Sequence, residues 1–236
     1  MLNHIEECRF AKMRDLCREL KMPPPVEIFV GSKLIDKNGI VLFDDIQRGH
    51  SWTRNYWNMQ MVLGLEASAF GDTTFGAGKI SSKNYAGAIV GTTNTSCIRA
   101  SSQNYAGAGV MDTSSASNFG ILIGTGVTAW SIDDYALATK IVHGNASNQM
   151  SYTAMATAVP TYASKVWTNV LSRIFNNNSG GTIVVAETAL VMQSYLFSAT
   201  SQYLIDRSVL ASSISTPNGA QLTVSYTLTM DFSAID

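Results

Sequence analysis

The stretch "AQLTVSYTLTMDF", residues 220–232, decides the fold class because apolar side chains alternate in it with small polar ones. The apolar set is Leu222, Val224, Tyr226, Leu228 and Met230. Successive side chains of a β-strand point to opposite faces, so this alternation predicts a strand with one buried face. The turn sequence Pro217-Asn218-Gly219 leads into it.

Further runs upstream have the composition of strands. They are residues 119–126, 150–159, 165–175, 182–192 and 202–210. Turn residues separate the later runs about every ten residues, a spacing typical of antiparallel folds. The sequence therefore predicts a mainly β chain, arranged as an antiparallel sandwich or a jelly-roll-like domain.

The N-terminal segment differs from the rest, since 17 of the 33 charged residues fall within residues 1–54. Residues 4–21 predict an amphipathic helix, with apolar side chains at three- and four-residue spacings. Pro23, Pro24 and Pro25 end this helix and form a stiff connector. We expect residues 1–25 to be a docking helix with its connector, and residues 26–236 to be a single β-rich domain.

Asn38-Gly39 lies between two apolar runs and predicts a hairpin with strands at 26–35 and 40–45. Residues 49–65 are rich in aromatic side chains and predict a short helix from Ser51 with a buried aromatic face.

Two similar segments follow, "SSKNYAGAIV" at 81–90 and "SSQNYAGAGV" at 101–110. Their Gly, Ala and Ser content alone is typical of a linker, but each carries a central Tyr. They predict paired strands with small residues on crowded faces.

The overall charge excludes several classes of partner. A net charge of −1 and a charged fraction of 14% give no surface that would coat nucleic acid or attract an acidic substrate. The apolar runs are too short to span a bilayer. We expect no membrane or specific nucleic-acid partner, and the low charge suits a surface that neighbouring proteins cover.

Histidine and cysteine residues form no strong metal motif. His4 and Cys8 are four residues apart on the predicted helix and Cys17 lies further along it, but a structural zinc site needs four ligands. No motif links His50, His143 and Cys97. Three cysteines cannot all pair, which favours a reducing compartment. Packing of a half-buried cysteine face is the favoured interpretation.

Catalytic motifs are also lacking, since no Gly-x-Ser-x-Gly elbow occurs. The acidic pairs Asp44-Asp45 and Asp133-Asp134 could hold Ca²⁺, but capping a helix or lining a turn is the commoner use of such pairs. We therefore expect a protein that is not an enzyme, with no catalytic, cofactor-binding or metal-binding residues and no cofactor.

The stretch "RIFNNNSGGTIVVAETALV", residues 173–191, resembles at first a glycine-rich ligand loop. A phosphate-binding loop needs a Lys after its glycines and a helix after that, and here β-branched residues follow directly. The stretch predicts an Asn/Gly turn between two paired strands.

Several motifs together resemble the virion structural proteins of tailed bacteriophages. They are "GHSWTRNYWN" at 49–58, "GILIGTG" at 120–126, "DDYALATKIVHG" at 133–144, "SRIFNNNSGGTIVVAETAL" at 172–190 and "LIDRSVLASSISTPNGAQLTVSYTLTMDF" at 204–232. Arg173, Phe175 and Glu187 match a signature of these proteins, whereas Ala189 replaces an expected glycine. We expect the three signature residues to hold the fold or a subunit contact.

The resemblance implies a non-enzymatic part of the tail or neck, such as a ring, collar or fibre-attachment protein. It would assemble in symmetric copies in the host cytoplasm and dock on a portal, tail or fibre protein through its N-terminal helix.

Two alternatives remain open. The first is a capsid decoration or head-fibre protein, and the second is a carbohydrate-binding or hydrolytic domain that recognises the host surface. For the second, the side chains of Trp52, Trp57, Trp130 and Trp167 could stack on sugars, although core packing is their favoured role.

Overall fold

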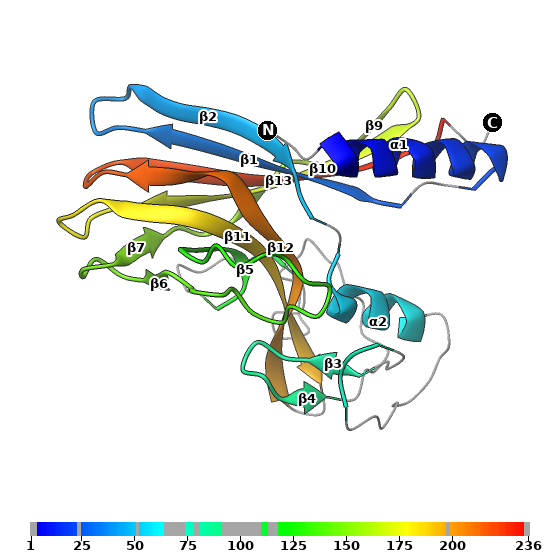
Figure 1. The fold of residues 1–236 in the computed structure, drawn as a ribbon. Helices are drawn as coiled ribbons and strands as arrows, with labels where there is room; N and C mark the ends of the chain where they lie inside the picture. Colours follow the sequence, from blue (N-terminus) through cyan, green and yellow to red (C-terminus); the bar gives the residue numbers. More distant parts are fainter. Residues whose placement is uncertain are drawn as a thin grey trace.

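A computed structural model describes residues 4–22, 25–50, 52–63, 74–77, 81–90, 110–112, 118–196 and 199–233. The chain is mainly β, with antiparallel and mixed sheets and an N-terminal helix (Figure 1). The predicted fold class is thus confirmed at this level, while the sandwich or jelly-roll arrangement stays a prediction. Within the described ranges, no helix combines the length and the apolar character needed to cross a membrane.

The longer elements overlap the runs expected from the sequence, but the expected run at 150–159 is divided between β7 and β8, and β12 extends beyond the expected 202–210. Their bounds are α1 His4–Glu19, β1 Glu27–Ile35, β2 Val41–Arg48, α2 Arg54–Leu63, β3 Ser82–Lys83, β4 Ile89–Val90, β5 Gly120–Gly124, β6 Val142–His143, β7 Gln149–Tyr152, β8 Ala156–Thr157, β9 Thr161–Ala163, β10 Val166–Asn176, β11 Ile183–Leu196, β12 Ala199–Thr216 and β13 Gln221–Asp231.

The larger sheet has the order β2-β1-β13-β10-β7-β6, and β8 and β9 also pair with β10. Strand β13 lies at its centre, antiparallel to both β1 and β10, so that Tyr226 stands opposite Val30 on one side and Leu171 on the other. The alternation in β13 is confirmed, because Leu222 to Leu228 are buried at every second position and Met230 is half-buried. Strands β6 and β7 pair in parallel, which makes the larger arrangement mixed.

The smaller sheet has the order β12-β11-β5 and shares one hydrophobic core with the larger sheet. Figure 1 shows the long strands β11 and β12 curving away from the larger sheet toward α2 and the β3–β4 hairpin. A hydrogen bond of 3.0 Å between the hydroxyls of Thr188 on β11 and Tyr226 on β13 crosses the interior between the sheets. Both hydroxyls are buried, so each satisfies the other.

The two sheets approach each other at both margins. At one margin the backbone N–H of Ile141 donates to the carbonyl of Ile123 on β5 at 3.0 Å, and the chain then continues into β6. At the other margin the side chain of Gln47 on β2 donates to the Val209 carbonyl at 3.0 Å and accepts from the Ala211 N–H at 2.7 Å. Gln47 therefore satisfies part of the backbone edge of β12, which would otherwise be a free strand edge.

The Asn/Gly stretch connects the sheets and does not form a hairpin. Strands β10 and β11 belong to different sheets and do not pair with each other, so the predicted turn between two paired strands is wrong in its pairing. Residues 177–182 instead carry the chain from one sheet to the other, and Gly180 adopts φ +83°. A positive φ is the conformation that glycine tolerates best, which explains the glycine here.

Asn177 links the connection between β10 and β11 to the connection between β12 and β13 through hydrogen bonds. Its side-chain N–H groups donate to the carbonyls of Gly181 at 2.8 Å and Thr216 at 2.7 Å. Its backbone N–H donates to the Ala220 carbonyl at 3.0 Å, and its own carbonyl accepts from Gly219. Asn177 is fully buried, so both crossings between the sheets depend on one side chain.

The predicted hairpin at Asn38-Gly39 is confirmed, with Gly39 at φ +84° and β2 extending to Arg48. The second helix begins at Arg54, later than the expected Ser51, which is itself outside the described residues. Just before the helix, the Thr53 hydroxyl donates to the Leu204 carbonyl at 2.7 Å, which ties the helix start to β12. Residues 81–90 form the β3–β4 hairpin, and residues 101–109 of the second repeat lie outside the described part.

Replacing Asn177 with Ala is expected to lower the free energy of unfolding by about 3 kcal/mol, because the buried Thr216 carbonyl and the part-buried Gly181 carbonyl and Ser179 N–H lose their side-chain partner. Asn178→Ala is the matched control, since Asn178 is exposed and makes only an exposed contact with Asn145. Urea unfolding followed by circular dichroism measures both variants. Equal stability of the two variants would contradict the role assigned to Asn177.

Candidate functional site

The N-terminal helix α1 is attached to the β domain through Arg48 at the end of β2. The guanidinium of Arg48 is buried and donates to Glu7 on α1 at 2.6 Å and to Glu27 on β1 at 2.5 Å. Arg14, further along the helix, also reaches Glu27 at 3.2 Å. The ring of Phe10 lies 4.3 Å from the Arg48 guanidinium. One face of the helix is therefore held by charge pairing and by a cation–π contact.

The pKa values of this network favour its charged form. The hydrogen bond from Arg48 lowers the pKa of Glu7. Burial alone would lower the pKa of Arg48, but its hydrogen bonds to Glu7 and Glu27 raise it above its ordinary value. Glu7 and Arg48 are consequently both charged at neutral pH, as their ion pair requires.

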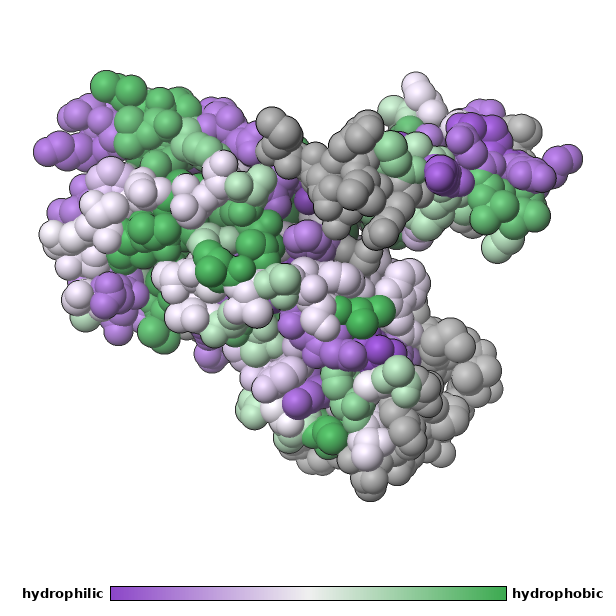
Figure 2. Space-filling model, viewed as in Figure 1, coloured by the Kyte–Doolittle hydropathy of each residue, from purple (hydrophilic) through white to green (hydrophobic). Residues whose placement is uncertain are grey.

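The rest of α1 and the residues after it carry exposed apolar side chains. Leu16, Leu20 and Met22 are 54%, 58% and 54% exposed. Figure 2 shows hydrophobic surface on this part of α1, which projects beyond the β domain. The predicted amphipathic helix exists, but the described β domain leaves this apolar surface uncovered.

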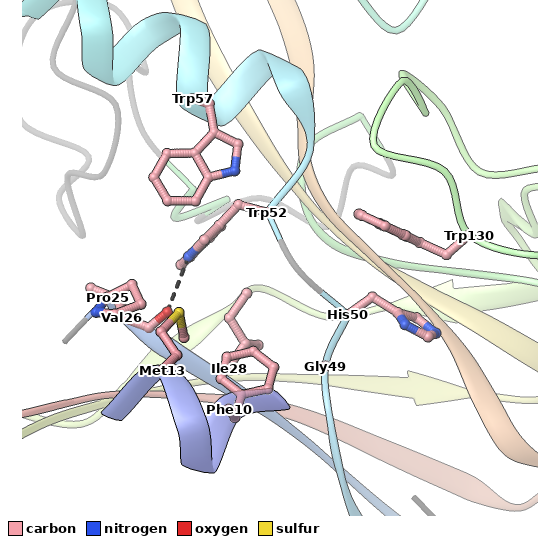
Figure 3. Close-up of a pocket in the computed structure, with 10 residues that line it drawn as sticks. All are labelled: Phe10, Met13, Pro25, Val26, Ile28, Gly49, His50, Trp52, Trp57 and Trp130. Atoms are coloured by element: carbon pink, nitrogen blue, oxygen red, sulfur yellow. Dashed lines mark hydrogen bonds between the residues drawn. The ribbon is translucent and has the colours of Figure 1, made fainter. Parts of the chain in front are cut away.

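A pocket of about 310 Å³ lies between α1 and the β domain (Figure 3). Its lining residues come from α1, the connector, β1, the segment before α2, α2 itself and the loop after β5. They are Phe10, Met13, Pro25, Val26, Ile28, Gly49, His50, Trp52, Trp57 and Trp130.

The aromatic side chains of the pocket form two stacked pairs. Trp52 stacks on Tyr56 with ring centroids 4.1 Å apart, and its indole N–H donates to the Val26 carbonyl at 3.2 Å. His50 stacks on Trp130 at 5.7 Å with an interplanar angle of 17°. The Trp52 hydrogen bond falls directly after the proline connector and so fixes where α1 leaves the β domain.

The structure brings three of the four tryptophans together at this pocket. Trp52 is nearly fully buried and contributes to the core, whereas Trp57 is 40% exposed. Trp167 lies apart on β10 and packs against the core. Trp52 and Trp57 are close together in the sequence, but no local pattern indicated that Trp130, from a distant segment, joins them.

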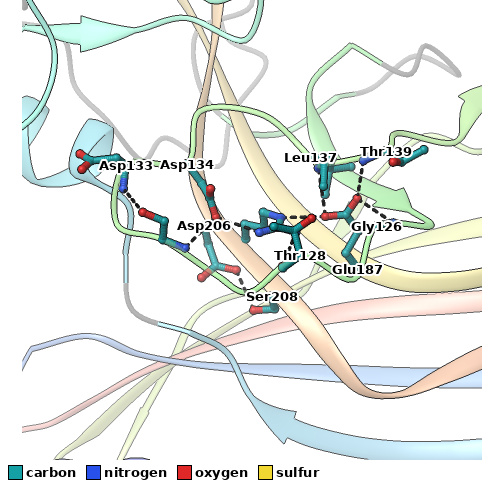
Figure 4. Close-up of polar contacts among 12 residues, drawn as sticks. Gly126, Thr128, Asp133, Asp134, Leu137, Thr139, Glu187, Asp206 and Ser208 are labelled. Carbon is teal, nitrogen blue, oxygen red and sulfur yellow. Dashed lines mark hydrogen bonds and ion pairs between the residues drawn. The ribbon is translucent and has the colours of Figure 1, made fainter.

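Glu187 and Arg207 hold the loop that carries Trp130, and Figure 4 shows the contacts of Glu187 with Gly126 and Thr139. Glu187 on β11 accepts backbone N–H bonds from Gly126 at 3.1 Å and Thr139 at 2.8 Å, and an Arg207 bond at 2.7 Å. Arg207 also donates to Asp134 at 2.9 Å and to a loop carbonyl. A Cβ atom at Gly126 would collide with the Glu187 carboxylate, so this close approach requires glycine.

Arg173 and Phe175 hold another irregular region. Arg173 donates to the carbonyls of Thr153 at 2.8 Å and Phe119 at 2.9 Å, and to the Asp112 carboxylate at 2.9 Å. Phe175 is fully buried and packs edge-on against an aromatic ring of β7. Because Arg173, Phe175 and Glu187 are all buried within this chain, the geometry favours a role in holding the fold over a subunit contact.

Three of the four carboxylates in the acidic pairs are engaged with cationic side chains. Asp44 pairs with Lys33 at 3.6 Å, Asp133 pairs with Arg54, and Asp134 pairs with Arg207. Asp134 also accepts from the Ser131 N–H at 3.0 Å, so this pair lines a turn. The described residues contain no group of three or more His, Cys, Asp or Glu side chains that could hold a metal ion.

The candidate metal ligands are not brought together where they are described. Cys8 is exposed on α1 and Cys17 is half-buried there, while the His4 side chain and Cys97 lie outside the described part. His50 is in the aromatic pocket, and His143 accepts the Tyr152 N–H at 3.0 Å through Nδ1.

Asp206 on β12 is a buried carboxyl group that sequence reasoning missed. Burial raises its pKa to about 7, although the Ser208 hydroxyl donates to it at 3.1 Å. Burial and the nearby Asp206 carboxylate also raise the pKa of Tyr226 well above its ordinary value. No alternation pointed to it, because every residue from Tyr203 to Ser208 is buried and the pairing register of β12 with β11 shifts between Asp206 and Leu204.

Comparison with protein-family models, with curated proteins and with solved structures found no match to this chain.

Asp206→Asn is expected to remove a pH-dependent loss of stability. The folded-state pKa of about 7 exceeds the ordinary value of 3.8, so the wild-type chain loses stability as the pH rises between these values. A tenfold difference in proton affinity between the folded and unfolded chain corresponds to about 1.4 kcal/mol. Urea unfolding between pH 4 and about pH 8 should show the variant gaining stability relative to wild type as the pH rises.

Asp45→Asn is the control for this measurement, because Asp45 is exposed on β2. If the free energies of unfolding of the wild-type chain and of Asp206→Asn change equally with pH, Asp206 is not the group that lowers the stability as the pH rises.

Proposed function

We propose that this chain is a non-enzymatic structural subunit of a tailed-phage virion, located in the tail or neck. In this proposal the β domain assembles in symmetric copies, and α1 docks on a neighbouring virion protein. The observation that carries the proposal is that α1 is attached to the β domain and still leaves apolar side chains exposed. Arg48 of the β domain forms an ion pair with Glu7 of the helix, while Leu16, Leu20 and Met22 remain exposed.

A partner that covers the exposed apolar side chains of this helix would stabilise it further. A 16-residue helix is marginal in water when it stands alone. Burying a leucine against a partner stabilises the complex by about 1.5 to 3 kcal/mol. The ion pairs at Glu7 and Arg14 set the direction of the helix before it meets its partner. Such an amphipathic helix fits a groove on an adjacent protein.

The edge of the larger sheet supports assembly as well. Strand β2 is the outer strand of that sheet, and Ile40, Val41, Leu42 and Ile46 at or near it are 59%, 48%, 50% and 70% exposed. An exposed apolar edge on a free monomer favours uncontrolled pairing, whereas in an assembled ring a neighbour covers it. The low charged fraction of 14% fits a surface that is largely covered.

The arrangement of the two sheets as an antiparallel sandwich forms part of the same proposal. An antiparallel sandwich is supported by two sheets that share one core and by the crossings at Asn177 and Ala220 that connect them. A sandwich presents its loops and one sheet edge to neighbours, as a ring subunit requires.

Virion position is supported by the resemblance of the 172–190 and 204–232 motifs to tail and neck proteins. A capsid decoration or head-fibre protein would use the same docking helix and is the alternative position. Labelled particles examined by electron microscopy distinguish the two positions.

The double variant Leu16→Ser, Leu20→Ser is expected to fold normally and to be lost from particles, because both side chains are exposed in the isolated chain. The matched control is Lys12→Ser, Glu19→Ser, which changes two exposed polar residues of the same helix. Quantitative mass spectrometry of purified particles measures incorporation, which we expect to fall at least tenfold, an effect of about 1.4 kcal/mol or more.

Two outcomes contradict the proposal. Absence of the wild-type protein from particles rejects a virion role. Equal incorporation of the double variant and the control rejects docking through α1.

A further inference from the structure

The turn of the β1–β2 hairpin carries three consecutive apolar side chains that are exposed to solvent. They are Ile40, Val41 and Leu42, at 59%, 48% and 50% exposure. The pairing of β1 with β2 shifts between Leu34 and Ile35, which leaves Leu42 as an extra residue on β2. Such a bulge re-aims the side chains beside it, and an exposed apolar run of this length is a liability unless it binds something.

Asp36 fixes the conformation of this turn. Its carboxylate accepts the backbone N–H groups of Asn38 and Ile40, both at 2.8 Å. Its own backbone N–H donates to the Ile40 carbonyl at 2.9 Å, and the N–H of Gly39 donates to the Asp36 carbonyl at 3.0 Å. The apolar run is therefore presented in a fixed geometry, which lowers the entropy cost of binding.

The pocket between α1 and the β domain offers an apolar surface of matching character. Its partly exposed lining side chains include Phe10, Met13, Val26 and Trp57 (Figure 3). None of the described lining residues is Asp, Glu, Lys or Arg. The volume of about 310 Å³ lies at the lower end of ligand pockets, so it has room for a few aliphatic side chains. Side chains that fill such a pocket commonly carry most of the binding energy of an interface.

The turn and the pocket lie at opposite ends of one copy, so the turn cannot reach the pocket of its own chain. Ile28 lines the pocket, and β1 ends seven residues later at Ile35. Seven residues of an antiparallel strand span roughly 24 Å. Figure 1 shows the β1–β2 turn at the end of the sheet that lies away from α1 and α2.

The charges beside the two surfaces are opposite in sign. Residues 33–45 of the hairpin carry three aspartates and two lysines, whereas residues 13–22 carry three cationic and two acidic side chains. Within the described part of the chain, neither Asp45 of the hairpin nor Lys21 after α1 forms an ion pair, and both are exposed. Opposite charges on two apolar surfaces speed their encounter and fix its orientation.

We propose that the hairpin turn of one copy inserts Ile40, Val41 and Leu42 into the pocket beside α1 of a second copy of this chain. Each copy has one turn and one pocket, so the contact is head-to-tail. It closes into a ring if the rotation between copies permits, and it otherwise continues as a helical filament. This inference rests on the proposed assembly in symmetric copies and names the surfaces that join them.

The test measures self-association of the full chain by sedimentation velocity over a range of concentrations. Wild type should form oligomers. Leu42→Asp places a charge in the turn, and Trp57→Ala removes a 40% exposed wall of the pocket. Each variant should associate at least tenfold more weakly than wild type. Circular dichroism should show both variants folded, because both side chains are partly exposed.

A mixture of the two variants separates this contact from other modes of association. Leu42→Asp keeps an intact pocket and Trp57→Ala keeps an intact turn, so the mixture should form dimers that do not grow further. Val142→Asp is the matched control, because Val142 is 51% exposed on β6, at the opposite edge of the larger sheet. This control should assemble as wild type does.

Three outcomes overturn the proposal. They are a wild-type chain that stays monomeric, whatever other protein its turn binds, equal association of Leu42→Asp and Val142→Asp, and a variant mixture that forms no dimers. A monomeric chain that is nevertheless present in particles would reject this contact alone. Oligomers joined through the turn and the pocket, in a chain that is absent from particles, would reject the virion role alone.

Discussion

A buried charge must be paired, and this constraint organises the irregular parts of the molecule. Arg48, Arg173 and Arg207 each project from a strand and are nearly inaccessible to solvent. Each donates to a carboxylate and so avoids the large cost of an isolated buried charge. Each also binds a segment outside the regular sheets, so the sheets supply the rigid frame and the arginines fix what is attached to it.

The two features of functional interest depend on two of these arginines. Arg48 determines where α1 leaves the β domain, and it leaves the apolar end of that helix exposed. Arg207, together with Glu187, determines the path of the loop that carries Trp130. Helix α1 and the aromatic pocket thus lie side by side because two ion-pair networks hold their components. A partner that moves α1 would also change one wall of the pocket.

Local patterns predicted the strands well, and long-range contacts set the limits of that prediction. The alternation in β13 and the Asn38-Gly39 turn are properties of neighbouring residues, so both could be predicted from the sequence. The bond between Arg48 and Glu7 joins residues 41 positions apart, and no spacing rule reveals such a pair. The turn in the Asn/Gly stretch was predicted at the right residues. The same local sequence, however, fits a turn between two paired strands and a connection between two different sheets.

Hydrogen exchange of Arg48→Met tests most directly whether a buried arginine fastens α1. The account predicts that the amides of α1 exchange at least tenfold faster, an effect of about 1.4 kcal/mol or more, while those of β13 keep their protection. Lys33→Met, which removes only an exposed ion pair with Asp44, should leave both elements unchanged. Unchanged protection of α1 in Arg48→Met, or an equal loss of protection in α1 and β13, would contradict the account.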